Sequence, residues 1–184
     1  NTKDVFEIEN LKPISVELRE GLALMNGTSV MTGIGIVNTL YSRQLLGWIT
    51  SSSAAINEIV KAYDDHLSYE LNQSKRHIGQ RQIAKSMREH LQDSKLTRKR
   101  EHHLYSKNED VSVFKEKVQE YYSLRCVPQI LGPVLDTLNS VEDILIEEVN
   151  SANDNPIVDV AKKHVYHGGN FHGDYVSLEM DKLK

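Results

Sequence analysis

The chain has 184 residues, of which 39% are hydrophobic and 26% are charged, and this is ordinary for one globular domain or for part of a larger one. Its formal net charge of −4 provides no overall attraction to nucleic acid or to acidic membranes, so neither is an expected partner. The single cysteine excludes an internal disulfide framework and is typical of a reducing compartment, which predicts a cytoplasmic protein.

Long helices are predicted, because only 4 prolines and 10 glycines interrupt the sequence. The first is expected over residues 15–25 and ends at Asn26-Gly27. Further helices are expected over 28–47, 52–71 and 80–92. Apolar residues recur at helical spacing in the segment 28–47: Val30, Ile34, Val37, Tyr41 and Leu45.

Residues 21–42 carry no charge over a length that could span a membrane. Six polar residues and one glycine interrupt this run: Asn26, Gly27, Thr28, Ser29, Thr32, Asn38 and Thr39. A helix buried inside a larger assembly is therefore the favoured interpretation, and no membrane association is expected.

The middle of the chain, residues 93–110, is polar and lacks periodicity, which predicts an exposed loop. Its basic residues are expected to be solvated surface rather than a phosphate site: Lys95, Arg98, Lys99 and Arg100.

A helix is expected to resume over residues 128–150, with Ser140 and Asp143 in a capping-like arrangement. The stretch at 151–156 then favours a turn, and weak alternation over 157–171 favours a small β-hairpin. A last helix begins near Asp174. The predicted fold class is all-α with one small hairpin.

The sequence does not favour metal binding or catalysis by a cysteine nucleophile. A cluster of possible metal ligands occurs near the C-terminal end, but it has neither the spacing nor the Cys pair of a metal site, so no metal is expected: His164, His167, His172 and Asp174. Arg125 could activate Cys126 as a nucleophile, yet the sequence places no histidine base nearby, so packing is the favoured role of Cys126.

Carboxylate recognition is the third candidate. Arg125 stands between Leu124 and Cys126, and an arginine in apolar surroundings is costly unless it is paired. A planar guanidinium can hold a carboxylate through two parallel hydrogen bonds. The alternative is a structural arginine paired with a helix carboxylate such as Glu147 or Glu148.

Five segments, taken together and in order, resemble the aromatic amino acid ammonia-lyase family, which includes histidine, phenylalanine and tyrosine ammonia-lyases and related aminomutases. They are "KPISVELREGLALMNGTSVMTG" (12–33), "HIGQ" (77–80), "VQEYYSLRCVPQILGP" (118–133), "NSANDNPIVD" (150–159) and "GGNFHG" (168–173). The resemblance covers nearly the whole chain and is most like the histidine enzymes. It implies long helices that form a central bundle in a homotetramer.

The resemblance also implies site roles. Arg125 corresponds to the arginine that clamps the substrate carboxylate, and Tyr122 to a tyrosine needed for catalysis. Asn26 corresponds to an asparagine beside the electrophile. Gln119 corresponds to a glutamine of the same network, and Phe171 to a phenylalanine that packs beside the cofactor and the substrate ring. Glu120 stands where the family usually has an aspartate.

The implied cofactor is a 4-methylidene-imidazol-5-one group made from an internal Ala-Ser-Gly tripeptide, which does not occur in this sequence. Residues 1–184 are therefore expected to be part of the central helical domain of a longer chain, inactive alone, with the cofactor-bearing N-terminal part and the C-terminal part outside it. Histidine, giving trans-urocanate, is the favoured substrate. A tyrosine or phenylalanine ammonia-lyase, a 2,3-aminomutase, and a non-catalytic helical self-assembly module are the alternatives.

Overall fold

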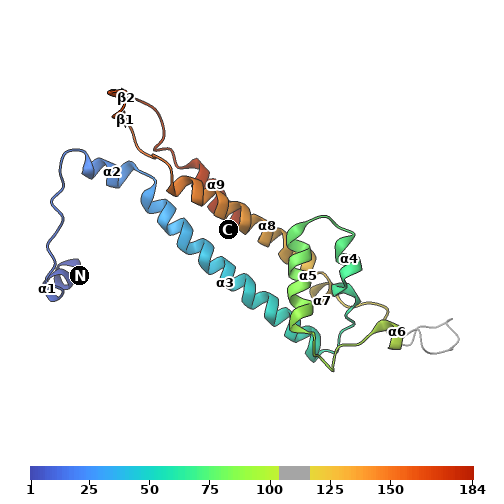
Figure 1. The fold of residues 1–184 in the computed structure, drawn as a ribbon. Helices are drawn as coiled ribbons and strands as arrows, with labels where there is room; N and C mark the ends of the chain where they lie inside the picture. The colour runs from blue at the N-terminus through green and yellow to red at the C-terminus, as the bar shows by residue number, and fades with distance from the viewer. Residues whose placement is uncertain (104–116) are drawn as a thin grey trace.

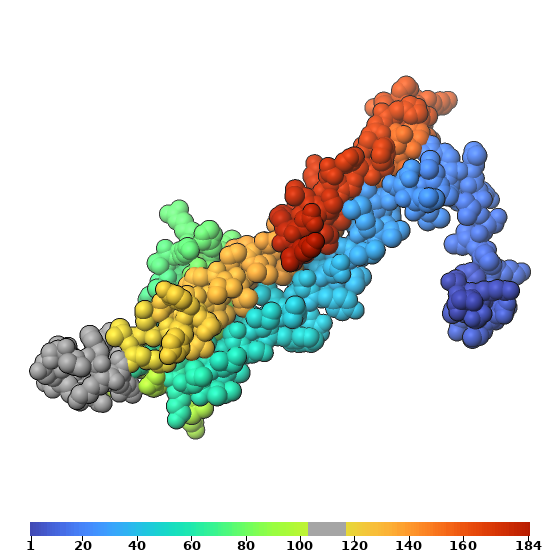
Figure 2. Space-filling model, turned by 180° about the vertical axis from the view of Figure 1, so that it is seen from behind, coloured from blue at the N-terminus to red at the C-terminus, as the bar shows by residue number. Residues whose placement is uncertain are grey.

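Two long antiparallel helices, α3 (Ser29–Ile59) and α8 (Val127–Val149), form the axis of this computed structural model, which describes residues 1–103 and 117–184. A shorter helix, α9 (Asp174–Leu183), packs along both. The result is a rod, and helix α1 (Thr2–Ile8) stands away from it at one end (Figures 1 and 2). The fold is mostly helical, as predicted.

Helix α3 is a single helix of 31 residues, so the predicted break between helices over 28–47 and 52–71 was wrong, and so was the continuation of the second one past Ile59. The serines at 51–53 do not interrupt it, because Leu46 and Ala54 on either side are buried against the neighbouring helices. Lys61, with a left-handed backbone (φ 53°), ends the helical path. A 3₁₀ turn, η1 (Asp65–Leu67), and helix α4 (Tyr69–Gln73) follow.

The buried face of α3 is made of small and polar residues: Thr32, Gly35, Thr39, Leu46, Thr50, Ala54 and Asn57. Its threonine hydroxyls donate to the carbonyl four residues earlier, as in Thr32 to Thr28 at 2.7 Å, so they are satisfied within the helix. Small side chains allow α8 to approach closely.

The apolar residues that the sequence placed at helical spacing lie on the opposite side of α3 and are exposed. This apolar stripe consists of Val30, Ile34, Val37, Tyr41, Leu45, Trp48, Ile56 and Ile59. Exposed apolar patches of this extent mark surfaces that other protein covers.

Helix α5 (Ile78–His90) packs on α8 and on the distal half of α3. Helices α6 (Arg100–His103) and α7 (Tyr122–Arg125) are short. Helix α8 continues unbroken through Ser140, so the predicted capping role of that residue was wrong. Part of the loop predicted over 93–110 lies outside the described residues.

The predicted hairpin is confirmed by strands β1 (Ile157–Asp159) and β2 (His164–Tyr166), with Val158 opposite Val165. Helix α2 (Glu20–Asn26) begins five residues later than predicted, because Arg19 has a left-handed backbone with φ 71°. In the described part of the chain no helix is long and apolar enough to cross a membrane.

The core has two parts. One gathers α3, α5 and the first half of α8, with Leu46, Ile83, Met87 and Leu138 at its centre. The other gathers α3, α9 and the second half of α8 around Val141, Leu145 and Val176. Together they lock α3 to α8 along the length of α8.

Helices α5 and α8 touch through two glycines. A Cβ atom on Gly79 would lie 2.1 Å from the carbonyl oxygen of Gly132, and the main-chain N–H of Gly79 donates to Asp136 Oδ1 at 2.8 Å. This contact fixes α5 beside the first half of α8.

The Gly79→Ala substitution is expected to lower the free energy of unfolding by about 1–3 kcal/mol, because the methyl group meets backbone that cannot move aside. Gly47→Ala in α3, where a Cβ would meet nothing within 4 Å, is the matched control. It is expected to raise stability by about 0.5–1 kcal/mol. Equal effects of the two substitutions in urea unfolding would contradict the close contact.

Candidate functional site

The turn that follows α8 organises one end of the rod. Arg19 donates from Nη2 to the carbonyl of Asn155 at 2.5 Å, and Asn155 Oδ1 accepts from the main-chain N–H of Gly168 at 2.7 Å. Asn170 donates from Nδ2 to the carbonyl of Ala152 at 3.1 Å. The turn at 151–156 therefore connects the start of α2 to the glycine-rich loop after the hairpin.

Asn26 and Phe171 are brought to this same end. Asn26 is the last residue of α2, and Thr28, two residues later, donates from its hydroxyl to Glu148 Oε1 at 2.5 Å. Phe171 lies in the loop that Asn170 anchors, with 43% of its surface exposed. The Asn26 side chain is exposed and makes no hydrogen bond to any residue in the described ranges.

Gln119, Tyr122 and Arg125 lie at the opposite end of α8, just before it begins. Arg125 donates from Nη1 to the carbonyl oxygen of Glu120 at 2.6 Å, and its guanidinium lies over the Tyr122 ring, 4.6 Å from the ring centroid. Tyr122 and Gln119 are exposed. We call these three residues the clamp group.

Neither helix carboxylate considered as a structural partner pairs with Arg125. Glu147 and Glu148 lie at the far end of α8, and Glu148 accepts from Thr28 instead. The guanidinium of Arg125 is half-buried, and its N–H groups beyond Nη1 have no partner in residues 1–103 and 117–184. Cys126 is a free, half-buried thiol.

The structure separates the five predicted site residues into two sets. The 23 residues of α8 lie between the clamp group and the turn at 151–156. At a rise of about 1.5 Å per residue this helix is about 35 Å long. Arg125 and Asn26 of one chain therefore cannot contact the same small molecule.

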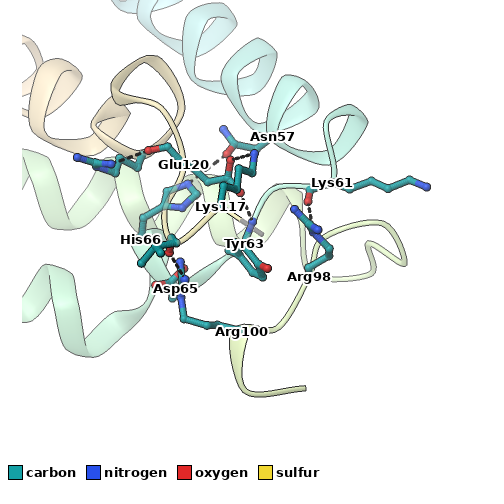
Figure 3. A network of polar contacts seen from close by, with 11 residues as sticks. Asn57, Lys61, Tyr63, Asp65, His66, Arg98, Arg100, Lys117 and Glu120 are labelled. Atoms are coloured by element: carbon teal, nitrogen blue, oxygen red, sulfur yellow. Dashed lines mark hydrogen bonds and ion pairs between the residues drawn. The ribbon is translucent and has the colours of Figure 1, made fainter. Parts of the chain in front are cut away.

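A polar network beside the clamp group was not predicted from the sequence (Figure 3). Glu120 is only 2% exposed, and its Oε1 accepts from the main-chain N–H of Tyr63 at 2.9 Å. Lys117 donates to the other carboxylate oxygen. Burial by itself raises the pKa of Glu120, but the hydrogen bonds from Lys117 and from Tyr63 outweigh it and hold the pKa below 4.5.

The ring of Tyr63 is fully buried and lies between two guanidiniums. Arg98 and Arg100 stand 4.5 and 4.4 Å from its centroid. Both arginines are half-buried, so the expectation that they are solvated surface was wrong; Lys95 and Lys99 are exposed as expected. Nothing in the local sequence connects them to Tyr63, which is more than thirty residues away.

His66 belongs to the same network. Its Nε2 lies 3.1 Å from Asn57 Oδ1, and the ring is largely buried. Burial lowers the pKa of His66 below its ordinary 6.5, against the opposing pull of Asp65 and Glu120.

Residues 1–103 and 117–184 contain no group of three or more His, Cys, Asp or Glu that could hold a metal ion. Of the four clustered residues near the C-terminal end, His172 and Asp174 approach each other at 3.3 Å, and His164 packs its ring on Tyr166.

Comparison with known proteins is consistent across the whole chain. The profile of the aromatic amino acid lyase family matches residues 1–184. A tyrosine 2,3-aminomutase from Myxococcus fulvus is 39% identical over 99% of this chain and 36% of its own length. A histidine ammonia-lyase from Bacillus anthracis is 35% identical over 96% of this chain and 32% of its own length.

Solved structures agree with this. The phenylalanine aminomutase of Pantoea agglomerans superposes with a TM-score of 0.87 at 34% identity, over 98% of this chain and 36% of that protein. A mostly helical rod with these motifs is the ammonia-lyase type of fold, and the chain belongs to the aromatic amino acid lyase family. It spans about a third of the length of these relatives.

The pH dependence of stability tests the polar network. Because the folded state keeps His66 neutral, its contribution is complete above pH 6.5 and is lost as pH falls through the lowered pKa. The melting temperature is expected to fall between pH 6.5 and 5, and to fall less in the His66→Gln variant, whose amide does not titrate. Scanning calorimetry at half-unit pH steps measures this. The same slope in both proteins would show that the ring titrates as in the unfolded chain.

Proposed function

We propose that these residues are the central helical part of an enzyme that eliminates ammonia from an aromatic L-amino acid. The observation that carries this proposal is Arg125, which is held at the start of α8 by the Glu120 carbonyl and stacked on Tyr122 in a chain that matches the family throughout. Membership of the family supports carbon–nitrogen bond cleavage as the reaction class. The individual residues support the role proposed for each of them.

Arg125 is proposed to bind the substrate carboxylate. One N–H group of the guanidinium is committed to a main-chain carbonyl, which fixes the plane of the fork while leaving the other donors for a ligand. A carboxylate held in this way fixes the position of the amino acid relative to the reacting groups. In well-oriented systems such positioning lowers the activation barrier by on the order of several kcal/mol.

Tyr122 and Gln119 are proposed to complete this end of the site. The phenol of Tyr122 is exposed and forms no hydrogen bond within the described ranges, so it is available to exchange a proton with a ligand. Gln119 presents an exposed amide from the same segment. Both groups stand within a few residues of the clamp.

Asn26 and Phe171 are proposed to form the cofactor side of the site. An exposed amide without a partner in the described residues and a half-exposed ring fit a small polar heterocycle. A 4-methylidene-imidazol-5-one group supplies an electrophile that draws electrons from the bound substrate. Its Ala-Ser-Gly precursor does not occur in this sequence, so the proposal assigns it to another part of the full-length chain.

We further propose that each site is completed between copies in a homotetramer. The two sets of site residues lie about 35 Å apart at opposite ends of α8, whereas a small substrate must contact both. The exposed apolar stripe of α3, whose members include Val37 and Leu45, offers the surface for such an assembly. Antiparallel packing of copies along this stripe would bring opposite ends together.

Histidine remains the proposed substrate, supported by the histidine ammonia-lyase of Bacillus anthracis among the relatives. Tyrosine is a second candidate, because the tyrosine 2,3-aminomutase of Myxococcus fulvus matches 99% of this chain. Phenylalanine is a further alternative within the family. The free cysteine supports the proposal of a cytoplasmic, reducing location.

The test uses the full-length enzyme with histidine, tyrosine or phenylalanine, followed by ultraviolet absorbance. Release of trans-urocanate from histidine with little product from the other two is the expected result. Chromatography for the β-amino acid in the same reactions distinguishes an aminomutase. If none of the three amino acids is consumed by a correctly assembled protein, the proposed activity is wrong and a helical assembly module is favoured.

A further inference from the structure

Glu120 is a buried carboxylate in the middle of the clamp group, and the proposed reaction does not use it. It stands between Gln119 and Tyr121, which are both exposed, while its own surface is 98% covered. Burying a carboxylate costs free energy, and replacing a buried ion pair by apolar groups is often neutral or stabilising. The ion pair of Glu120 with Lys117 is therefore weak evidence that Glu120 serves only to stabilise the fold.

The side chain of Glu120 connects the segment before α8 to the main chain at Tyr63. One carboxylate oxygen accepts from the main-chain N–H of Tyr63 at 2.9 Å. That N–H is fixed in turn, because its neighbours are bonded to the strand-like segment at Arg98: the N–H of Arg98 donates to Ala62 O at 2.9 Å, and the N–H of Asp64 donates to Arg98 O at 3.2 Å. Figure 3 shows Glu120 and Tyr63 meeting at this point.

The main chain of Glu120 holds the arginine. Its carbonyl oxygen is the acceptor for Arg125 Nη1 at 2.6 Å. The same residue is thus anchored through its side chain and orients the guanidinium through its backbone. Movement of Glu120 would turn its carbonyl group, and the guanidinium plane of Arg125 would then no longer be held in one orientation.

We propose that Glu120 is a positioning residue for the carboxylate clamp: its buried carboxylate, bound to Tyr63 and Lys117, sets the carbonyl that orients Arg125. This inference rests on the proposed function, since it assumes that Arg125 receives a carboxylate. The ligand class is the carboxylate of an aromatic amino acid or of its unsaturated acid product.

The experiment uses the full-length enzyme and measures inhibition by trans-urocanate, trans-4-coumarate and trans-cinnamate, each beside its primary amide. The acid needs the charged fork and the amide does not. In the Glu120→Gln variant, the acid that inhibits the unaltered enzyme is expected to bind about tenfold more weakly, while its amide changes less than about twofold. Arg125→Lys, which keeps the charge but loses the fork, sets the scale of the full effect.

Glu179→Gln is the matched control, because Glu179 is also a buried carboxylate, 3% exposed, paired with a lysine three residues away. It is expected to change stability but not the ratio of acid to amide binding. Glu120→Asp, which restores the charge, is expected to recover most of that ratio. If Glu120→Gln does not fold, Lys117→Gln replaces it, with an expected loss of about threefold in acid binding alone.

An unchanged ratio in a folded Glu120→Gln or Lys117→Gln variant would overturn the positioning role while leaving the proposed function intact. An equal loss for acid and amide would also overturn it, since that marks general damage. If no acid inhibits the unaltered enzyme and no amino acid is consumed, the proposed function fails and the role of Glu120 fails with it.

Discussion

The close, antiparallel contact between α3 and α8 is the constraint on which the rest of the structure depends. The face that α3 turns toward its neighbours is made of threonines, a glycine, an alanine, an asparagine and a single leucine, so the two helices approach closely and share two small cores. The apolar stripe of α3, from Val30 to Ile59, is left on the outside. Exposed apolar faces of this extent are typical of surfaces that other protein covers.

The same pairing decides where the predicted site residues lie. Helix α8 begins two residues after Arg125 and leads into the turn at 151–156, so it separates the two sets of predicted site residues by about 35 Å. Each set is supported by its own polar network, around Glu120 and Tyr63 at one end and around Asn155 at the other.

The sequence predicts much of this at the level of elements and little at the level of contacts. Periodicity and turn residues located α5, α8, α9 and the hairpin. The predicted helix break between residues 47 and 52 and the predicted capping role of Ser140 were wrong, because tertiary packing of Leu46, Ala54 and Val141 outweighs local propensity. Asn26, Phe171, Gln119, Tyr122 and Arg125 were found through motif resemblance. Their division between two ends follows from the length of α8. The contact between Glu120 and Tyr63 joins residues 57 positions apart, and no local pattern encodes it.

Mixed assembly of two full-length variants tests the central claim that one site draws on different copies. Asn26→Ala and Arg125→Ala chains are each expected to be inactive alone. After unfolding and refolding together in equal amounts, they are expected to recover about a quarter of the unaltered activity, because random assembly gives that share of sites one intact residue of each kind. If the mixture remains as inactive as the separate variants while forming mixed oligomers, both residues serve within a single chain and the account is contradicted.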